Sequence, residues 1–273
     1  MIDLHLHTTA SDGLLAPAAL VARAAACGLR TISVTDHDTL AGVAEADAAA
    51  HRHGLRLVCG VEVTAVEDGR DVHMLAYFID PSNAAFAAFL EAQRSDRLRR
   101  VRAIADRLAA LGSPIDCGPL LALAAGKPGH SVGRPQIADA LVAAGRAVNR
   151  DDAFDRFLGP GAPAFVPRSG PAPETVIAVV CRAGGIVSLA HPGLTKMDPI
   201  IPRLAAAGLA SLEVRHSDHD AATEERYRQT AAQHGLAVSG GSDFHGDAGR
   251  RASLLGSVTL SAGELAALET RRP

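Results

Sequence analysis

MIDLHLHTTASDG, residues 1–13, combines the pattern of a β-strand with the side chains of a metal site. Three apolar residues alternate with Asp3, His5 and His7. Successive side chains of a strand point to opposite faces, so His5 and His7 share one face about 7 Å apart. Two imidazoles at that spacing can converge on one ion. The alternative interpretation is an edge strand with incidental histidines.

The strand pattern recurs along the chain, and the stretches of helical period between the strands mostly end in glycine. Repeated strand–helix units predict a parallel sheet. Seven strands favour a sheet that closes or nearly closes into a barrel, in which residues 2–7 would not form an exposed edge. The seven predicted strands cover residues 2–7, 31–36, 55–66, 71–79, 185–192, 210–217 and 236–245.

Residues 81–165 interrupt this alternation with a pattern that is helical throughout, including one long helix over 86–112. This segment has eleven Lys or Arg and eight Asp or Glu, whereas the whole chain has a net charge of −3. A Pro- and Gly-rich stretch closes it. We therefore predict an α/β barrel domain from residues 1–80 and 166–273, with an inserted helical subdomain at 81–165.

The composition excludes several classes of protein. Of 273 residues, 48% are hydrophobic and none is Trp, so a core is well supplied but a base-stacking platform is not. Together with the acidic balance, this argues against stable binding of long nucleic acids. The four cysteines are far apart and are interpreted as buried, reduced residues. No signal peptide or membrane-spanning run is evident, so a cytoplasmic location is expected.

Metal-type side chains recur on six of the predicted strands, mostly toward their C-terminal ends. Barrels of parallel strands gather their catalytic residues at that end. His73 fits this rule least well, because it comes early in its strand. Six strands that carry such residues together favour a site for several metal ions. The candidate ligands are His5, His7, Asp12, His37, Glu62, His73, His191, Asp243 and His245.

Most of these residues also have an ordinary interpretation when taken singly. Asp12 lies in an Asp-Gly turn, where aspartate is common. Asp36 and Asp38 could cap the following helix, and a lone His73 could be a buried core residue. Glu62 is hardest to dismiss, because a carboxylate inside an apolar strand is costly to bury unpaired.

These motifs resemble the PHP (polymerase and histidinol phosphatase) family of metal-dependent phosphoesterases. The matching segments are DLHLHTTASDG, TDHDT, GVEVT, DVHMLAYFID, LAHPG and GGSDFHG. The resemblance implies a distorted seven-stranded β/α barrel with three metal ions at the strand ends. Asp12 stands where the family often has histidine. The implied ligands are His5, His7, Glu62 and Asp243 for one ion, Glu62, His73 and His191 for a second, and Asp12, His37 and His245 for a third.

The predicted insertion resembles one subgroup of this family. That subgroup includes phosphatases of 3′,5′-nucleoside bisphosphates and 5′→3′ exoribonucleases that trim short RNA. One departure is Gln136, at a position where the subgroup commonly has histidine.

Imidazole and carboxylate ligands without thiolates suit Mn²⁺, Zn²⁺ or Fe²⁺. Clustered divalent ions lower the pKa of bound water and neutralise phosphate oxygens. We therefore expect in-line attack by a metal-held hydroxide on a phosphomonoester. No further catalytic residue is assigned.

For binding the substrate, Arg134 is the first candidate, because it opens a predicted helix, where a guanidinium and the helix dipole both favour anions. Part of the arginine-rich run at 94–102 is a further candidate. His216 and His219 close a strand at the same end of the barrel. The expected substrates are nucleotides with 3′ and 5′ phosphates, such as 3′-phosphoadenosine 5′-phosphate, and short 5′-phosphorylated RNA. The alternatives are a phosphatase of another small phosphoester, such as histidinol phosphate, or a non-catalytic, metal-stabilised module.

Overall fold

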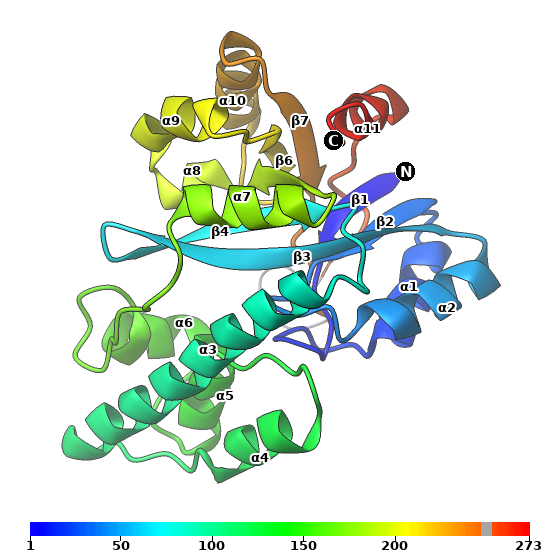
Figure 1. Cartoon of the computed structure of the whole chain (residues 1–273). Helices are drawn as coiled ribbons and strands as arrows, with labels where there is room; N and C mark the ends of the chain where they lie inside the picture. The colour runs from blue at the N-terminus through cyan, green and yellow to red at the C-terminus, as the bar shows by residue number, and fades with distance from the viewer. Residues whose placement is uncertain (247–252) are drawn as a thin grey trace.

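Seven strands form one sheet in the sequential order β1 to β7 (Figure 1). The computed structural model describes residues 1–246 and 253–273. All seven predicted strands are present. Every residue of the short strands β1, β2 and β5 is buried, as expected where helices or neighbouring strands cover both faces. The strands are β1 Ile2–Leu6, β2 Thr31–Val34, β3 Arg56–Glu67, β4 Arg70–Tyr77, β5 Ile186–Leu189, β6 Ser211–His216 and β7 Ala237–Gly241.

The sheet curls so that its first and last strands approach each other. The His7 N–H donates to the Phe244 carbonyl at 3.0 Å, and the Asp243 N–H donates to the His5 carbonyl at 2.9 Å. Leu6 and Phe244 form an isolated parallel bridge. The result is the nearly closed barrel that the sequence predicts, and β1 has no free edge at this end.

The prediction of a parallel sheet is wrong for one strand. β4 runs antiparallel to both of its neighbours, β3 and β5. A two-residue turn, Asp68-Gly69, joins β3 to β4, whereas a parallel crossover needs a dozen residues or more. Both turn residues have positive φ, 48° and 72°, as the favoured hairpin turn requires. The reversal carries the early part of β4 alongside the late part of β3, and places His73 opposite Thr64.

Helices cover the outside of the barrel, as the predicted alternation of strands and helical stretches leads one to expect. One apolar cluster joins α1 and α2 to β1 and β2, and a larger one joins α7, α9 and α10 to β3–β6. Gly54 ends α2 with φ +66°. The helices are α1 Pro17–Ala26, α2 Val43–His53, α7 Pro173–Arg182, α8 Pro192–Thr195, α9 Ile201–Ala206, α10 Ala221–Gln233 and α11 Ala262–Glu269, with a 3₁₀ turn at Asp198–Ile200.

Only helices lie between β4 and α7, and Figure 1 shows them grouped on one side of the barrel. Asn83 caps the longest helix, α3, by accepting a hydrogen bond from the Phe86 N–H. The segment has its own apolar cluster of buried residues between Val101 and Val166. The division into an insertion at 81–165 and a barrel domain remains a prediction. The helices are α3 Ala84–Ala110, α4 Gly118–Gly126, α5 Arg134–Ala143, α6 Arg150–Ala153 and a π-helical turn at Phe154–Leu158.

All four cysteines are free, as predicted, but the prediction that they are buried is wrong. Cys27 and Cys181 are exposed, while Cys59 and Cys117 are partly covered. Cys59 and Cys117 nevertheless pack against apolar clusters, that of the barrel and that of the helical segment. None of the described helices is long and apolar enough to cross a membrane.

Candidate metal centre

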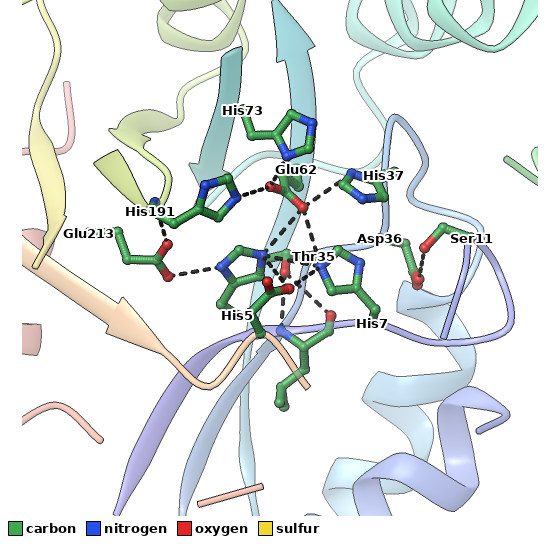
Figure 2. A network of polar contacts seen from close by, with 12 residues as sticks. His5, His7, Ser11, Thr35, Asp36, His37, Glu62, His73, His191 and Glu213 are labelled. Carbon is green, nitrogen blue, oxygen red and sulfur yellow. Dashed lines mark hydrogen bonds and ion pairs between the residues drawn. The ribbon is translucent and has the colours of Figure 1, made fainter. Parts of the chain in front are cut away.

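The nine candidate ligands lie together in the structure, and Figure 2 shows their central part. His5 is on β1, and His7 and Asp12 follow it. His37 follows β2, and His191 follows β5. The reversed direction of β4 explains why His73 reaches the same place from early in its strand. The remaining members are Glu62 on β3, and Asp243 and His245 after β7.

Glu62 is the centre of the cluster and is 1% exposed. One carboxylate oxygen, Oε1, lies 2.8 Å from His73 Nδ1 and 3.2 Å from His191 Nε2. Burial opposes ionisation, but the nearby His37 and His73 hold the pKa of Glu62 well below its usual range. The other oxygen, Oε2, lies within 3.1–3.3 Å of a nitrogen of each of three further imidazoles, those of His5, His7 and His37. A carboxylate with such neighbours on both oxygens is suited to bridge two ions.

One group consists of His5, His7 and Asp243, and Glu62 Oε2 lies 3.3 Å and 3.2 Å from the Nε2 atoms of the two histidines. The Nε2 atoms of His5 and His7 are 3.1 Å apart, and Asp243 Oδ1 is 3.3 Å and 3.1 Å from them. Atoms that share one ion at about 2.1 Å lie about 3.0–3.4 Å from each other. The separations therefore fit a single ion between these side chains.

A second group contains His7, Asp12, His37 and His245, whose ligand atoms lie within 4.8 Å of one another. Asp12 Oδ1 is 3.6 Å from His7 Nδ1 and 3.4 Å from His245 Nε2, and Asp12 Oδ2 is 3.6 Å from His37 Nε2. These are long for direct hydrogen bonds. A third group consists of His37, Glu62 and His73.

The electrostatics favour positive charge inside the cluster. Burial opposes protonation, but hydrogen bonds to Asp243 and Glu62 raise the pKa of His7 to about 10. Burial instead lowers the pKa of His37 to about 3, which keeps that imidazole neutral and available as a ligand. Among the described residues, the buried nitrogens His7 Nδ1 and His191 Nδ1 have no hydrogen-bond partner. Unpartnered imidazole nitrogens beside ionised carboxylates fit divalent cations.

Glu213 on β6 belongs to the same buried network but was not predicted from the sequence. Its Oε1 accepts a hydrogen bond from His5 Nδ1 at 2.9 Å, and its Oε2 accepts one from the His191 N–H at 2.7 Å. The signal that singled out Glu62, a carboxylate inside an apolar strand, is also present in the segment ASLEVRHS at 210–217.

His216 and His219, the two histidines predicted to face the substrate, lie in different surroundings. His216 is buried, and its Nε2 is 3.4 Å from Asp243 Oδ2, so it contacts the cluster. His219 lies outside the cluster. Its Nδ1 donates to the Val214 carbonyl, and its Nε2 accepts from the Gly193 N–H. Both nitrogens of His219 are therefore engaged with the backbone.

The aspartates beside His37 do not cap the following helix. Asp36 accepts hydrogen bonds from the Thr8 and Ser11 side chains, which fastens the loop after β1. Asp38 accepts from the Thr64 N–H and from Arg97. Helix α2 begins after Gly42 with no side-chain cap, so the alternative of helix capping is wrong for both.

A cavity of about 230 Å³ adjoins the cluster, and His37 and His73 are part of its wall. Four arginines line it, namely Arg97 and Arg100 on α3, Arg134 at the start of α5, and Arg168 before α7. The predicted candidate Arg134 and part of the arginine run are thus at this cavity. Arg168 was not predicted, because it lies in a connection without helical or strand period.

Two carboxylates hold the four arginines in pairs. Asp38 is 2.6 Å from Arg97 Nε and 3.0 Å from Arg168 Nη1. Asp71 is 3.0 Å from Arg100 Nη1 and 2.9 Å from Arg134 Nη2. Burial and the neighbouring Arg100 lower the pKa of Arg134 to about 10, so its guanidinium still carries its charge at neutral pH. The cavity wall thus has more positive charge than its carboxylates neutralise.

Gln136, the departure from the subgroup, connects the helical segment to a candidate ligand loop. Its Oε1 accepts from the Gly133 N–H at 2.8 Å, and its Nε2 donates to the Ser11 carbonyl at 2.6 Å. Ser11 precedes Asp12, so the side chain of Gln136 fixes the backbone next to a candidate ligand.

Comparison with known proteins agrees with this geometry. A family model described as the PHP domain matches residues 3–115. The 3′,5′-nucleoside bisphosphate phosphatase of Chromobacterium violaceum is 35% identical over 256 residues, which cover 91% of this chain and 89% of that protein. The chain belongs to the PHP family. A Haemophilus influenzae relative of this PHP protein, named 5′-3′ exoribonuclease, is 36% identical over 248 residues, which cover 89% of each chain.

Two solved structures have the same fold. A Bifidobacterium adolescentis protein, described by inference as a metal-dependent phosphoesterase, superposes with a TM-score of 0.90 at 37% identity. The match covers 100% of this chain and 96% of that protein. A Chromobacterium violaceum amidohydrolase with bound sulfate and no metal has a TM-score of 0.87 at 33% identity, with 99% and 96% covered. This PHP-family chain is therefore a metal-dependent phosphoesterase.

Proposed function

We propose that this phosphoesterase removes phosphate from nucleotides that carry 3′ and 5′ phosphates, and acts also on short 5′-phosphorylated RNA. The observation that carries the proposal is that His37 and His73 belong both to the metal cluster and to the wall of the arginine-lined cavity, so the two adjoin. A substrate with two phosphates can place one at the cluster and the other among the arginines. The names of the two curated relatives support this substrate class.

The proposal assigns three divalent ions to the nine candidate ligands, with Mn²⁺, Zn²⁺ or Fe²⁺ as the candidates. Glu62 would bridge, because neighbouring imidazoles contact both of its oxygens. When bound, such ions lower the pKa of a water ligand and neutralise charge on the phosphoryl oxygens. The proposed ligands are His5, His7 and Asp243 with Glu62 for one ion, His73 and His191 with Glu62 for a second, and Asp12, His37 and His245 for a third.

The arginines bind and orient the substrate. Arg134 Nη2 and Arg100 Nη1 share Asp71, so each guanidinium keeps further N–H groups for a phosphate. Guanidinium–phosphate contacts are charge-assisted and often bidentate, which fixes the substrate's orientation as well as its affinity. A solved relative at 33% identity holds sulfate, an anion of the same shape as phosphate.

The test is phosphate release by the Mn²⁺-loaded protein from four substrates: 3′-phosphoadenosine 5′-phosphate, AMP, histidinol phosphate and a 5′-phosphorylated RNA dinucleotide. We expect the bisphosphate or the RNA to have the highest kcat/KM. A preference for histidinol phosphate would contradict the nucleotide assignment. No phosphate release from any of the four substrates with metal bound would instead favour a non-catalytic binding module.

A further inference from the structure

Glu213 is a fully buried carboxylate whose two oxygens both contact the proposed metal ligands. It is 0% exposed and lies in the middle of β6. The register between β6 and β7 shifts between Glu213 and Arg215, so the strand is irregular at this position. Irregular positions of this kind often re-aim a side chain next to an active site. An ionised group so deeply buried needs specific partners to offset its desolvation.

The first partner of Glu213 is His5. Because an ionised carboxylate only accepts hydrogen bonds, the 2.9 Å contact places a proton on His5 Nδ1. In the neutral ring, Nε2 then has a free lone pair. That Nε2 atom lies 3.1 Å from His7 Nε2 and 3.3 Å from Asp243 Oδ1, which is the place proposed for one ion. Glu213 thus selects the tautomer of His5 that can bind a metal.

The second partner is the backbone of His191. Its N–H donates to Glu213 Oε2 at 2.7 Å. His191 has φ +27° and ψ 59°, which is a strained conformation for a residue with a side chain. The conformation directs His191 Nε2 to within 3.2 Å of Glu62 Oε1. The hydrogen bond that the His191 N–H donates to the Glu213 carboxylate stabilises the backbone that presents this second candidate ligand.

We propose that Glu213 is a positioning residue that sets the metal affinity of two proposed ion sites at once, through His5 and through His191. The inference rests on the metal centre of the proposed function but not on its substrate. Carboxylates that receive the second N–H of a ligating histidine typically change metal affinity by about 10–100-fold when they are replaced. Glu213 also lies with His5 and His216 in a group of possible ligand atoms, but both of its oxygens accept hydrogen bonds from N–H donors, which favours a positioning role.

The experiment compares Glu213→Gln with the parent protein for Zn²⁺ affinity, by competition with a chromogenic chelator, and for Zn²⁺ content at saturation. An amide has one accepting and one donating end, so it cannot accept from both partners. We expect an affinity loss of about 10–100-fold with an unchanged number of ions at saturation. Glu264→Gln is the matched control, because Glu264 is a partly buried carboxylate that contacts Ser261, Arg215 and Arg228 away from the cluster.

Two outcomes overturn the proposal. An affinity within about threefold of the parent means that Glu213 does not position the ligands, and the loss of one ion at saturation means that it is itself a ligand. If the variant does not fold, histidine ¹⁵N NMR of the Zn²⁺-loaded parent decides. We expect a protonated Nδ1 on His5, and a protonated Nε2 refutes the inference. Neither readout uses a substrate, so failure of the proposed substrate class leaves this test intact.

Discussion

Glu62 is the side chain that contacts most of the other candidate ligands. Its two oxygens lie within 3.3 Å of a nitrogen of each of five imidazoles. Removal of its charge would leave the neighbouring groups in place and weaken the binding of each ion that it is proposed to bridge.

Glu62→Gln should therefore lower kcat for phosphate release by at least about 100-fold, because replacement of even a metal ligand's hydrogen-bond partner costs up to that factor. The measurement is steady-state turnover at saturating Mn²⁺. The control is Glu264→Gln, which changes a carboxylate outside the site. Activity within about threefold of the parent would contradict the assignment of Glu62.

Arg134→Met should raise KM for the bisphosphate more than it lowers kcat. A lost charge-assisted hydrogen bond corresponds to about 2 kcal/mol, or roughly thirtyfold in kcat/KM. Arg150→Met is the control, because Arg150 lies in the same helical segment but pairs with exposed Asp139. Equal kinetics for the two variants would remove Arg134 from the substrate site.

Much of the candidate site could be predicted from single residues, and the failures have physical causes. Histidines and carboxylates at strand ends can be predicted to form one site, because the strands of a barrel place their end residues close together. Glu213, like Glu62, is a carboxylate inside an apolar strand pattern. In that strand, however, only the histidine at the end, His216, was predicted to belong to the site. Arg168 could not be predicted, because a connection without periodicity does not show which way its side chains point.

At the scale of elements, the β3–β4 hairpin decides where His73 lies. The signal for this hairpin was present in the sequence, because Asp68-Gly69 between two strands is typical of a tight turn. The alternation of strands and helices on either side favours a parallel sheet, so the hairpin was not predicted. The long helix α3 was predicted within two residues at each end, because its apolar period continues without interruption.

Gly69→Ala should reduce the free energy of unfolding by about 1 kcal/mol, because alanine is strained at φ +72°. No atom lies within 4 Å of the added Cβ, so the effect is purely conformational. Urea unfolding measures it. Gly126→Ala is the control, since Gly126 also has open space around it but ordinary φ. Equal stability changes in the two variants would contradict the turn geometry.

At the scale of the whole molecule, the metal cluster joins strands that are distant in the sequence. Its candidate ligands come from β1, β3 and β4 and from the segments after β1, β2, β5 and β7. The barrel and its closure followed from the number and order of the strands. The position of the helical segment against the cluster could not be predicted, because long-range side-chain pairs such as Arg97–Asp38 leave no periodic signal in the sequence.

Removal of metal should therefore lower the melting temperature. Ions that bind only the folded chain stabilise it by mass action, by about 4 kcal/mol at a thousandfold excess over Kd. Differential scanning calorimetry with Mn²⁺ and with a chelator measures the shift. The shift should be smaller in Glu62→Gln, which has lost the proposed bridge. Identical melting temperatures with metal and with chelator would show that the cluster does not hold ions tightly.

The most direct test of the account is phosphate release from 3′-phosphoadenosine 5′-phosphate by chelator-treated protein that is then titrated with Mn²⁺. The account predicts no turnover before titration and full turnover once the ions proposed for His5, His7, Glu62 and their neighbours are supplied. Turnover at the parent rate without metal, or none with the ions bound, would contradict it.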